Sequence, residues 1–172
     1  MKQLYILLFL FFLPGSGHSF VQKNSKEQSK LEWYTDLIQA NEVSKTTHKP
    51  IFAFFTGSDW CGWCRKLQNE VFAKPAFIKW AKEKVILLEL DFPRMKQLPP
   101  ELAQQNSQLQ NAFKVGGFPT IWIFFMTRNE AGNNFNITPL GSTGYPSGAE
   151  PGKEEVKFIH EADLILANNI AK

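Results

Sequence analysis

The chain has 172 residues, of which 44% are hydrophobic and 14% aromatic, and its formal net charge is +3. This length favours a single domain, and 16 phenylalanines are enough to build a buried core. Basic and acidic residues are mixed along the chain without a basic arm or a basic-aromatic stripe, so we expect no nucleic-acid partner.

Residues 1–19 have the pattern of a secretory signal peptide. Lys2 precedes a ten-residue apolar run, residues 4–13, which a Pro-Gly pair ends. A helix needs about 20 apolar residues to span a membrane, so this run is too short to be an anchor. We therefore expect cleavage after Ser19, an exported protein without stable membrane insertion, and a bacterial periplasm as its compartment.

Apolar runs and helical patterns alternate after a polar segment, residues 20–30, that we expect to be a flexible leader. The run IFAFFT is typical of a strand buried on both faces of a sheet. The elements predicted in this half are a short edge strand at 31–33, a helix at 34–49, a strand at 51–56, helices at 65–72 and 75–84, and a strand at 85–92.

The second half of the chain predicts a helix, a hairpin and a final helix. Strands that alternate with helices indicate an α/β fold with a central mixed sheet, mainly parallel, flanked by helices on both faces. The hairpin supplies its antiparallel strands. The predicted elements are a helix at 99–115, a turn at 116–119 followed by a strand to 127, a turn at 128–134, a strand at 135–142 and a helix at 153–168.

The two cysteines of the chain, Cys61 and Cys64, follow the predicted strand at 51–56 in the sequence DWCGWC. A disulfide between them would stabilise the fold little, because the entropy that a disulfide removes grows with loop length. A helix that begins at the motif would favour negative charge on Cys61, since its first N–H groups are unpaired. We therefore assign Cys61 as the nucleophile and Cys64 as the resolving thiol.

Two other interpretations of the cysteine pair stay open, a stable local disulfide and half of a metal site. A closed zinc site needs four nitrogen or sulfur ligands. The remaining candidates after the predicted cleavage, His48 and His160, do not stand at ligand spacing from the cysteines. We therefore predict a redox pair and expect neither a metal nor a cofactor.

The motif DWCGWC after a buried strand, together with GGFPT at 116–120, resembles the thioredoxin superfamily. The sequence is similar to exported thioredoxin-like proteins and to the periplasmic C-terminal domain of the DsbD reductases. The resemblance covers residues 31–168 and implies a thioredoxin fold for a domain over residues 31–172.

The resemblance also implies roles for four residues around the cysteines. Pro119 should follow a cis peptide bond and lie against the sulfurs, which leaves the backbone of Phe118 open to an extended substrate strand. Trp60 should cover the site and form part of an apolar docking surface. Trp63, between the cysteines, should be exposed and could contact a substrate or a redox partner.

The sequence departs from the thioredoxin pattern in two places. The buried acid that assists the resolving cysteine in thioredoxins is replaced by Phe54 or Phe55, which leaves Glu89 or Asp91 as weak substitutes. The dipeptide between the cysteines is Gly-Trp, which differs from those of thioredoxin and of strong oxidants. This dipeptide strongly affects the reduction potential.

These features predict an exported thiol–disulfide oxidoreductase that exchanges disulfides with protein substrates through its Cys-Gly-Trp-Cys pair. We expect it to act as a reductase that receives electrons from a membrane reductase. Two alternatives stay open: a disulfide-forming oxidase or isomerase, and a non-catalytic binding module or chaperone with the same fold.

Overall fold

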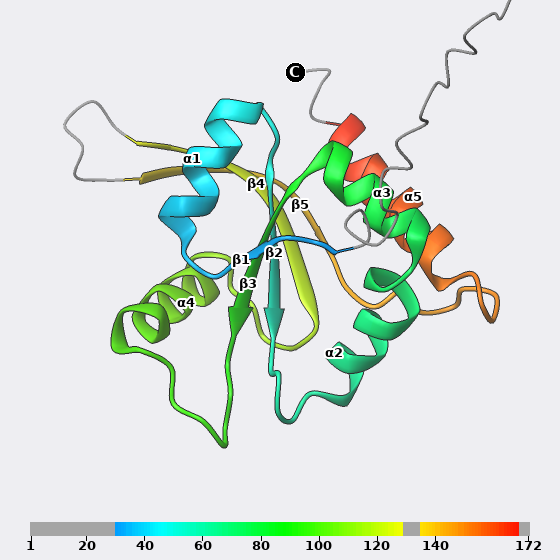
Figure 1. Ribbon diagram of the computed structural model, residues 1–172, viewed down its shortest axis with the longest axis horizontal. Helices are drawn as coiled ribbons and strands as arrows, with labels where there is room; N and C mark the ends of the chain where they lie inside the picture. Colours follow the sequence, from blue (N-terminus) through cyan, green and yellow to red (C-terminus); the bar gives the residue numbers. More distant parts are fainter. Residues whose placement is uncertain (1–29, 129–134, 169–172) are drawn as a thin grey trace, which may run out of the picture.

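The computed structural model describes residues 30–128 and 135–168, so the predicted signal peptide and nearly all of the leader lie outside the described residues. Helix α2 continues directly into a short π-helical segment, η1. In chain order the elements are β1 (Trp33–Tyr34), α1 (Leu37–Thr47), β2 (Ile51–Thr56), α2 (Gly62–Leu67), η1 (Gln68–Phe72), α3 (Pro75–Lys84), β3 (Ile86–Asp91), α4 (Pro100–Ala112), β4 (Thr120–Arg128), β5 (Phe135–Thr143) and α5 (Glu154–Ala167) (Figure 1).

The five strands form one mixed sheet in the order β1-β3-β2-β4-β5. Strands β1, β3 and β2 are parallel, whereas β4 is antiparallel to both β2 and β5. The predicted mixed sheet is therefore confirmed, and its antiparallel pairings belong to the predicted hairpin of β4 and β5. Strand β4 starts beside the end of β2, where Thr120 pairs with Phe55, and it runs back along β2 in the opposite direction (Figure 1).

Helices cover both faces of the sheet, as the sequence predicts. Helices α1 and α4 lie on one face, and α2, η1, α3 and α5 lie on the other (Figure 1). Side chains of β2 alternate between two cores, since successive residues of a strand point to opposite faces. Phe52 and Phe54 lie in the core with α2, α3 and α5, while Ala53 and Phe55 lie in the core with α1 and α4.

The outer strands of the sheet are short or irregular. Strand β1 pairs with β3 over two residues, Trp33 and Tyr34. Strand β5 contains Pro139, which is paired with Phe124 next to a shift in register.

None of the described helices is both long enough and apolar enough to cross a membrane.

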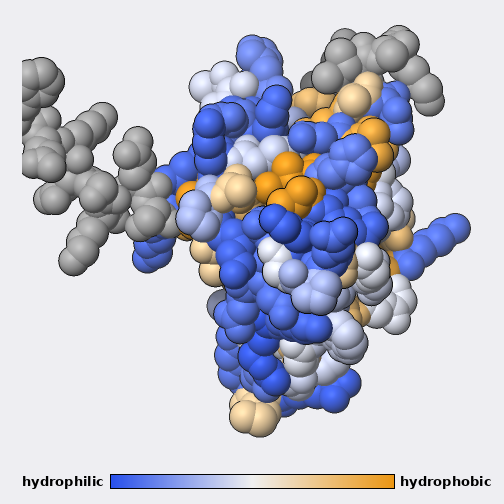
Figure 2. Space-filling model, turned by 90° about the vertical axis from the view of Figure 1, so that its right-hand side faces the viewer, coloured by the Kyte–Doolittle hydropathy of each residue, from blue (hydrophilic) through white to orange (hydrophobic). Residues whose placement is uncertain are grey.

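Viewed from the side of α3 and α5, the surface divides into two parts (Figure 2). Apolar side chains gather in the upper part, and the described residues of α5 include the exposed Val156 and Leu164. The lower part, toward the end where α2 lies in Figure 1, is mostly hydrophilic. The surface that surrounds α2 on this side is therefore polar.

Candidate active site

The cysteine pair lies where the chain passes from β2 into α2. Cys61 is the N-cap of α2, and Cys64 lies in its first turn, with 5.2 Å between the two Cα atoms. The two sulfurs form a disulfide, and the N–H of Cys64 donates a hydrogen bond of 3.1 Å to Sγ of Cys61. Cys61 is 5% exposed and Cys64 is 1% exposed, so Cys61 is the more accessible of the two. Its sulfur therefore lies where the unpaired N–H groups of the helix favour negative charge.

The loop before the cysteines is folded onto itself and onto the end of β3. The N–H groups of Trp60 and Cys61 donate to the carbonyl oxygen of Gly57, at 3.2 and 2.8 Å. The N–H and the hydroxyl of Ser58 both donate to the buried carboxylate of Asp91, at 2.8 and 2.7 Å. These contacts fix the position of Cys61 relative to the sheet.

The loop after β3 is attached to the same segment through a second carboxylate, that of Asp59. It accepts hydrogen bonds from the N–H groups of Arg94, at 3.1 Å, and Met95, at 2.7 Å. The hydrogen bond from Met95 is the main cause that lowers the pKa of Asp59. In the same loop Lys96 lies 3.1 Å from the carboxylate of Asp91, and this contact raises the pKa of Lys96.

Trp60 fills the space between these two loops and the turn before β4. Its indole N–H donates to the carbonyl oxygen of Phe92 at 2.8 Å, and the guanidinium carbon of Arg94 lies 3.8 Å from the centre of its ring. The centre of the Phe118 ring lies 5.8 Å from the centre of the Trp60 ring. Trp60 thus packs against the core that contains both cysteines.

The turn before β4 brings Phe118 and Pro119 to the site, and the peptide bond between them is cis. The centres of the Phe118 and Phe92 rings lie 5.0 Å apart, and Phe118 packs against the core that contains both cysteines. The hydroxyl of Thr120 donates to the carbonyl oxygen of Gly117 at 2.8 Å and so closes the turn. Because β4 begins at Thr120, the backbone of Phe118 lies outside the ladder of the sheet.

Trp63, between the two cysteines in the chain, is 56% exposed. Its ring contacts Tyr145 at 5.0 Å, and the ammonium of Lys66 lies 5.0 Å from the ring of Trp63 and 4.9 Å from that of Tyr145. The hydroxyl of Tyr145 also donates a hydrogen bond to the carboxylate of Glu70. Desolvation, followed by this bond, raises the pKa of Tyr145, and a hydrogen bond with Tyr145 raises that of Lys66.

The cluster of Lys66, Glu70 and Tyr145 could not be predicted from the sequence. Tyr145 lies in a loop after β5, and no spacing connects that loop with α2 and η1. An aromatic residue among turn formers in GYPSG is the one signal that could have indicated it. The contacts that Tyr145 and Lys66 make with the exposed Trp63 are therefore known only from the structure.

Phe54, and not Phe55, lies in the same core as the cysteines. Glu89 is its partner in β3 and faces the same side of the sheet, since Phe54 and Glu89 are paired in register. Burial raises the pKa of Glu89, and the negative charge of Asp91 raises it further. Asp91 itself is bound by Ser58 and Lys96, whereas Glu89 forms no ion pair within residues 30–128 and 135–168.

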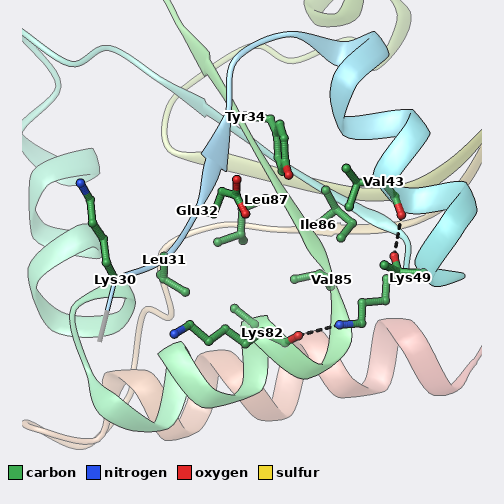
Figure 3. A pocket seen from close by; sticks show the side chains of 12 residues that line it. Lys30, Leu31, Glu32, Tyr34, Val43, Lys49, Lys82, Val85, Ile86 and Leu87 are labelled. Atoms are coloured by element: carbon green, nitrogen blue, oxygen red, sulfur yellow. Dashed lines mark hydrogen bonds between the residues drawn. The ribbon is translucent and has the colours of Figure 1, made fainter. Parts of the chain in front are cut away.

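A hollow of about 410 Å³ lies elsewhere, between β1, α1 and α3 (Figure 3). Its lining includes Lys30, Tyr34 and the first residues of β3, and the ammonium of Lys49 donates to the carbonyl oxygen of Lys82 across it at 2.6 Å. The cysteines follow the last residue of β2, which is parallel to β3. The hollow is therefore at the opposite end of the sheet from the site.

The structure thus brings Trp60, Cys61, Cys64, Phe118 and Pro119 together at one end of β2. The family model described as a thioredoxin-like domain matches residues 37–133, which include all five. The chain belongs to the thioredoxin-like family. The disulfide bond reductase DsbH of Chlamydia pneumoniae is 35% identical to this thioredoxin-like chain over 133 residues, which are 77% of this chain and 79% of that protein.

A second relative and two solved structures agree with this assignment. The thioredoxin-related protein DsbJ of Chlamydia pneumoniae is 28% identical over 96% of this chain but only 45% of its own length. A solved structure of a DsbH oxidoreductase has a TM-score of 0.67 and 30% identity and covers 88% of this chain and 95% of that one. A thioredoxin from Thermus thermophilus, with a TM-score of 0.52 and 14% identity over 79% of this chain and 87% of its own, shows the fold alone.

The protein therefore has a thioredoxin-like fold and is a homologue of a disulfide reductase, with Cys61 and Cys64 as its CXXC pair.

Proposed function

We propose that this thioredoxin-like protein reduces disulfides of exported proteins through Cys61 and Cys64. The observation that carries the proposal is the disulfide at the N-terminus of α2, packed in one core with Trp60 and Phe118. Thiol–disulfide exchange requires an attacking thiolate, a second thiol within reach and access for the substrate. The adjacent position of the two sulfurs and the greater exposure of Cys61 support the proposal.

In the first step the thiolate of Cys61 attacks one sulfur of the substrate disulfide. The substrate S–S bond breaks, a mixed disulfide with Cys61 forms, and the other substrate sulfur leaves as a thiolate that takes a proton from water. Cys61 has this role because it is the more exposed of the pair and because the N–H of Cys64 points at its sulfur. Both properties favour a reactive anion at Cys61.

In the second step Cys64 loses its proton and attacks Sγ of Cys61. The mixed disulfide breaks, the Cys61–Cys64 disulfide forms, and the second substrate sulfur leaves as a thiolate. Two electrons have then passed to the substrate, and the pair is in the oxidised form. A membrane reductase is the electron source that we propose for its return to the dithiol.

The substrate is proposed to bind as an extended segment beside Phe118. The backbone of Phe118 lies outside the ladder of β4, so its N–H and C=O can pair with a peptide strand. Trp60 and Trp63 lie on the two flanks and supply apolar contacts. This arrangement presents the substrate sulfur to Cys61.

The proposal also covers the direction of electron transfer, from this protein to its substrate, and the cellular compartment of the protein. The similarity to the disulfide bond reductase DsbH supports the reducing direction. The apolar run at residues 4–13, outside the described residues, supports export, with the bacterial periplasm as the compartment.

Two measurements test this function. The purified protein should accelerate the reduction of insulin by dithiothreitol, and Cys61→Ser should abolish the acceleration. The reduction potential should lie near that of thioredoxin, about −270 mV, rather than near about −120 mV, the value of a strong oxidant. A potential at the oxidising end would assign a disulfide-forming role, and no acceleration by the wild type would favour a binding module.

A further inference from the structure

We propose that the loop after β3, residues 92–98, is a second recognition element that selects acidic segments next to the substrate's disulfide. This inference rests on the proposed function and adds a substrate class to it. It concerns a stretch that the mechanism above does not use.

The positive and negative side chains around the cysteine pair differ in their exposure to solvent. All four nearby cationic side chains are exposed, whereas three carboxylates are partly or fully buried. Each of these carboxylates accepts a hydrogen bond from a backbone N–H group or a side-chain hydroxyl. Lys96 is paired with Asp91 at 3.1 Å, and Lys66 lies near the charges of Glu70 and Glu154. Within the described residues Arg65 and Arg94 form no ion pair, so they carry the positive charge of the rim that a substrate meets. The cations are Arg65, Lys66, Arg94 and Lys96, and the carboxylates are Asp59, Glu70 and Asp91.

Arg94 is held in place beside the site before any substrate arrives. Its N–H is bound by Asp59, and its guanidinium stacks on Trp60 at 3.8 Å. Within residues 30–128 and 135–168, no carboxylate makes an ion pair with this guanidinium. A stacked guanidinium keeps its N–H donors at the edge of the plane, where they match a carboxylate in a two-point contact. Because the side chain is already ordered, binding loses little further entropy.

Met95 and a hollow beside the loop offer room for the rest of a peptide. Met95 is 84% exposed, and methionine adapts its shape to different apolar partners. A hollow of about 330 Å³ lies between the loop and α4, with Pro93, Lys96 and Leu98 in its lining. A segment that leaves the active site past Trp60 would therefore meet a cation, an apolar side chain and a recess.

The other flank carries a second ordered cation. The ammonium of Lys66 lies between the rings of Trp63 and Tyr145, at 5.0 and 4.9 Å from their centres. A substrate with carboxylates on both sides of its cysteine would thus meet Arg94 on one side and Lys66 on the other. Electrostatic complementarity of this kind raises the association rate and the selectivity of an interface.

The test compares three peptide disulfides that differ only in the residues flanking the cysteine: acidic, neutral amide or basic. Each rate constant with the reduced protein is divided by the rate constant of the same peptide with dithiothreitol, which removes differences in intrinsic reactivity. We expect the normalised acidic-to-basic ratio to be about 10 at low salt and to fall toward 1 in 0.5 M salt, because salt screens exposed charges.

Variants assign the effect to the loop. Arg94→Gln should lower the ratio about threefold, and Arg94→Lys should restore part of it. Lys66→Gln should lower it independently and tests the rim even if the Arg94 variants do not fold. Lys79→Gln, which removes an exposed cation from α3, is the matched control and should leave the ratio unchanged.

A wild-type ratio near 1, or an unchanged ratio in a folded Arg94→Gln protein, would overturn the inference while leaving the proposed function intact. Failure to reduce even the neutral peptide would instead reject the proposed function. Equal peptide rates together with binding to vesicles of anionic lipid would assign the positive rim to a membrane surface and also overturn the inference.

Discussion

A methyl group on Gly57 would lie 2.4 Å from Cε2 of the Trp60 indole. Cβ atoms essentially never come closer than 3.0 Å to such a neighbour, so the ring and Gly57 fit together because Gly57 has no side chain. The carbonyl oxygen of Gly57 also accepts hydrogen bonds from the N–H groups of Trp60 and Cys61. Gly57 therefore connects the position of the indole with that of the nucleophile.

Gly57→Ala should displace Trp60 and lower the free energy of unfolding by about 1–3 kcal/mol, since the loop has no room for an added carbon. The rate of insulin reduction should fall at the same time. Denaturant unfolding and the insulin assay measure the two effects. Gly116→Ala is the matched control, because a Cβ at that position also meets nothing within 4 Å and Gly116 lies outside the cysteine motif. Equal unfolding curves for the two variants would contradict this account.

Cys64→Ser should accumulate mixed disulfides with protein substrates, because the adduct on Cys61 then has no resolving thiol. Cys61→Ser should trap no substrate, since Cys64 is 1% exposed. Non-reducing gels of the two variants, incubated with oxidised insulin, would show the adducts. Trapping through Cys64 would reverse the assignment of the two roles.

Reduced Cys61 should react with iodoacetamide about tenfold faster at pH 7 than a free cysteine in a peptide, because the helix N-terminus and the N–H of Cys64 stabilise its thiolate. Cys64→Ala provides a protein with a single thiol for this measurement, and rates taken from pH 4 to 9 give the ionised fraction. A rate equal to that of the peptide would remove the basis of the first step.

Glu89→Gln should make the protein more stable at pH 8 but change its stability little at pH 4. The pKa of Glu89 is raised above its ordinary value of 4.5, first by burial and then by the charge of Asp91. The folded protein therefore holds this proton more tightly than the unfolded chain, so the free energy of unfolding falls as the pH rises from about 4.5 through the raised pKa. The glutamine side chain does not ionise between pH 4 and pH 8, so the variant does not have this loss of stability.

Urea unfolding at the two pH values measures this effect. The exposed Glu83 of α3 provides the control substitution to glutamine. If Glu89→Gln stabilised the protein equally at pH 4 and pH 8, the pKa of Glu89 could not be the cause.

The sequence predicts the order of helices and strands and the place of the cysteine pair, because these depend on local patterns. The antiparallel hairpin of β4 and β5 was predicted as well, but its place beside β2 was not, because that place depends on the path of the chain after α4 and on no local pattern. Hydrophobic alternation also could not decide between Phe54 and Phe55. The strand IFAFFT is buried on both faces, so it has no polar side chain to mark the face of the cysteines.

The surroundings of the site depend on contacts between segments that are far apart in the chain. Asp59 binds Arg94 across 35 positions, and Tyr145 binds Glu70 across 75. Neither pair has a periodicity or a motif that a single sequence could reveal. The chemistry of the cysteines could therefore be predicted, whereas the residues that hold the two tryptophans in place could not.

Pro139 has a consequence for the behaviour of the protein at high concentration. A long, regular outer strand exposes a row of N–H and C=O groups that can pair with another molecule. Pro139 carries no N–H group and lies next to a register shift in β5, and β1 at the other side is two residues long. Neither margin of the sheet, as far as the structure describes it, therefore offers a long regular template for intermolecular strand addition. We expect this to disfavour aggregation through the sheet.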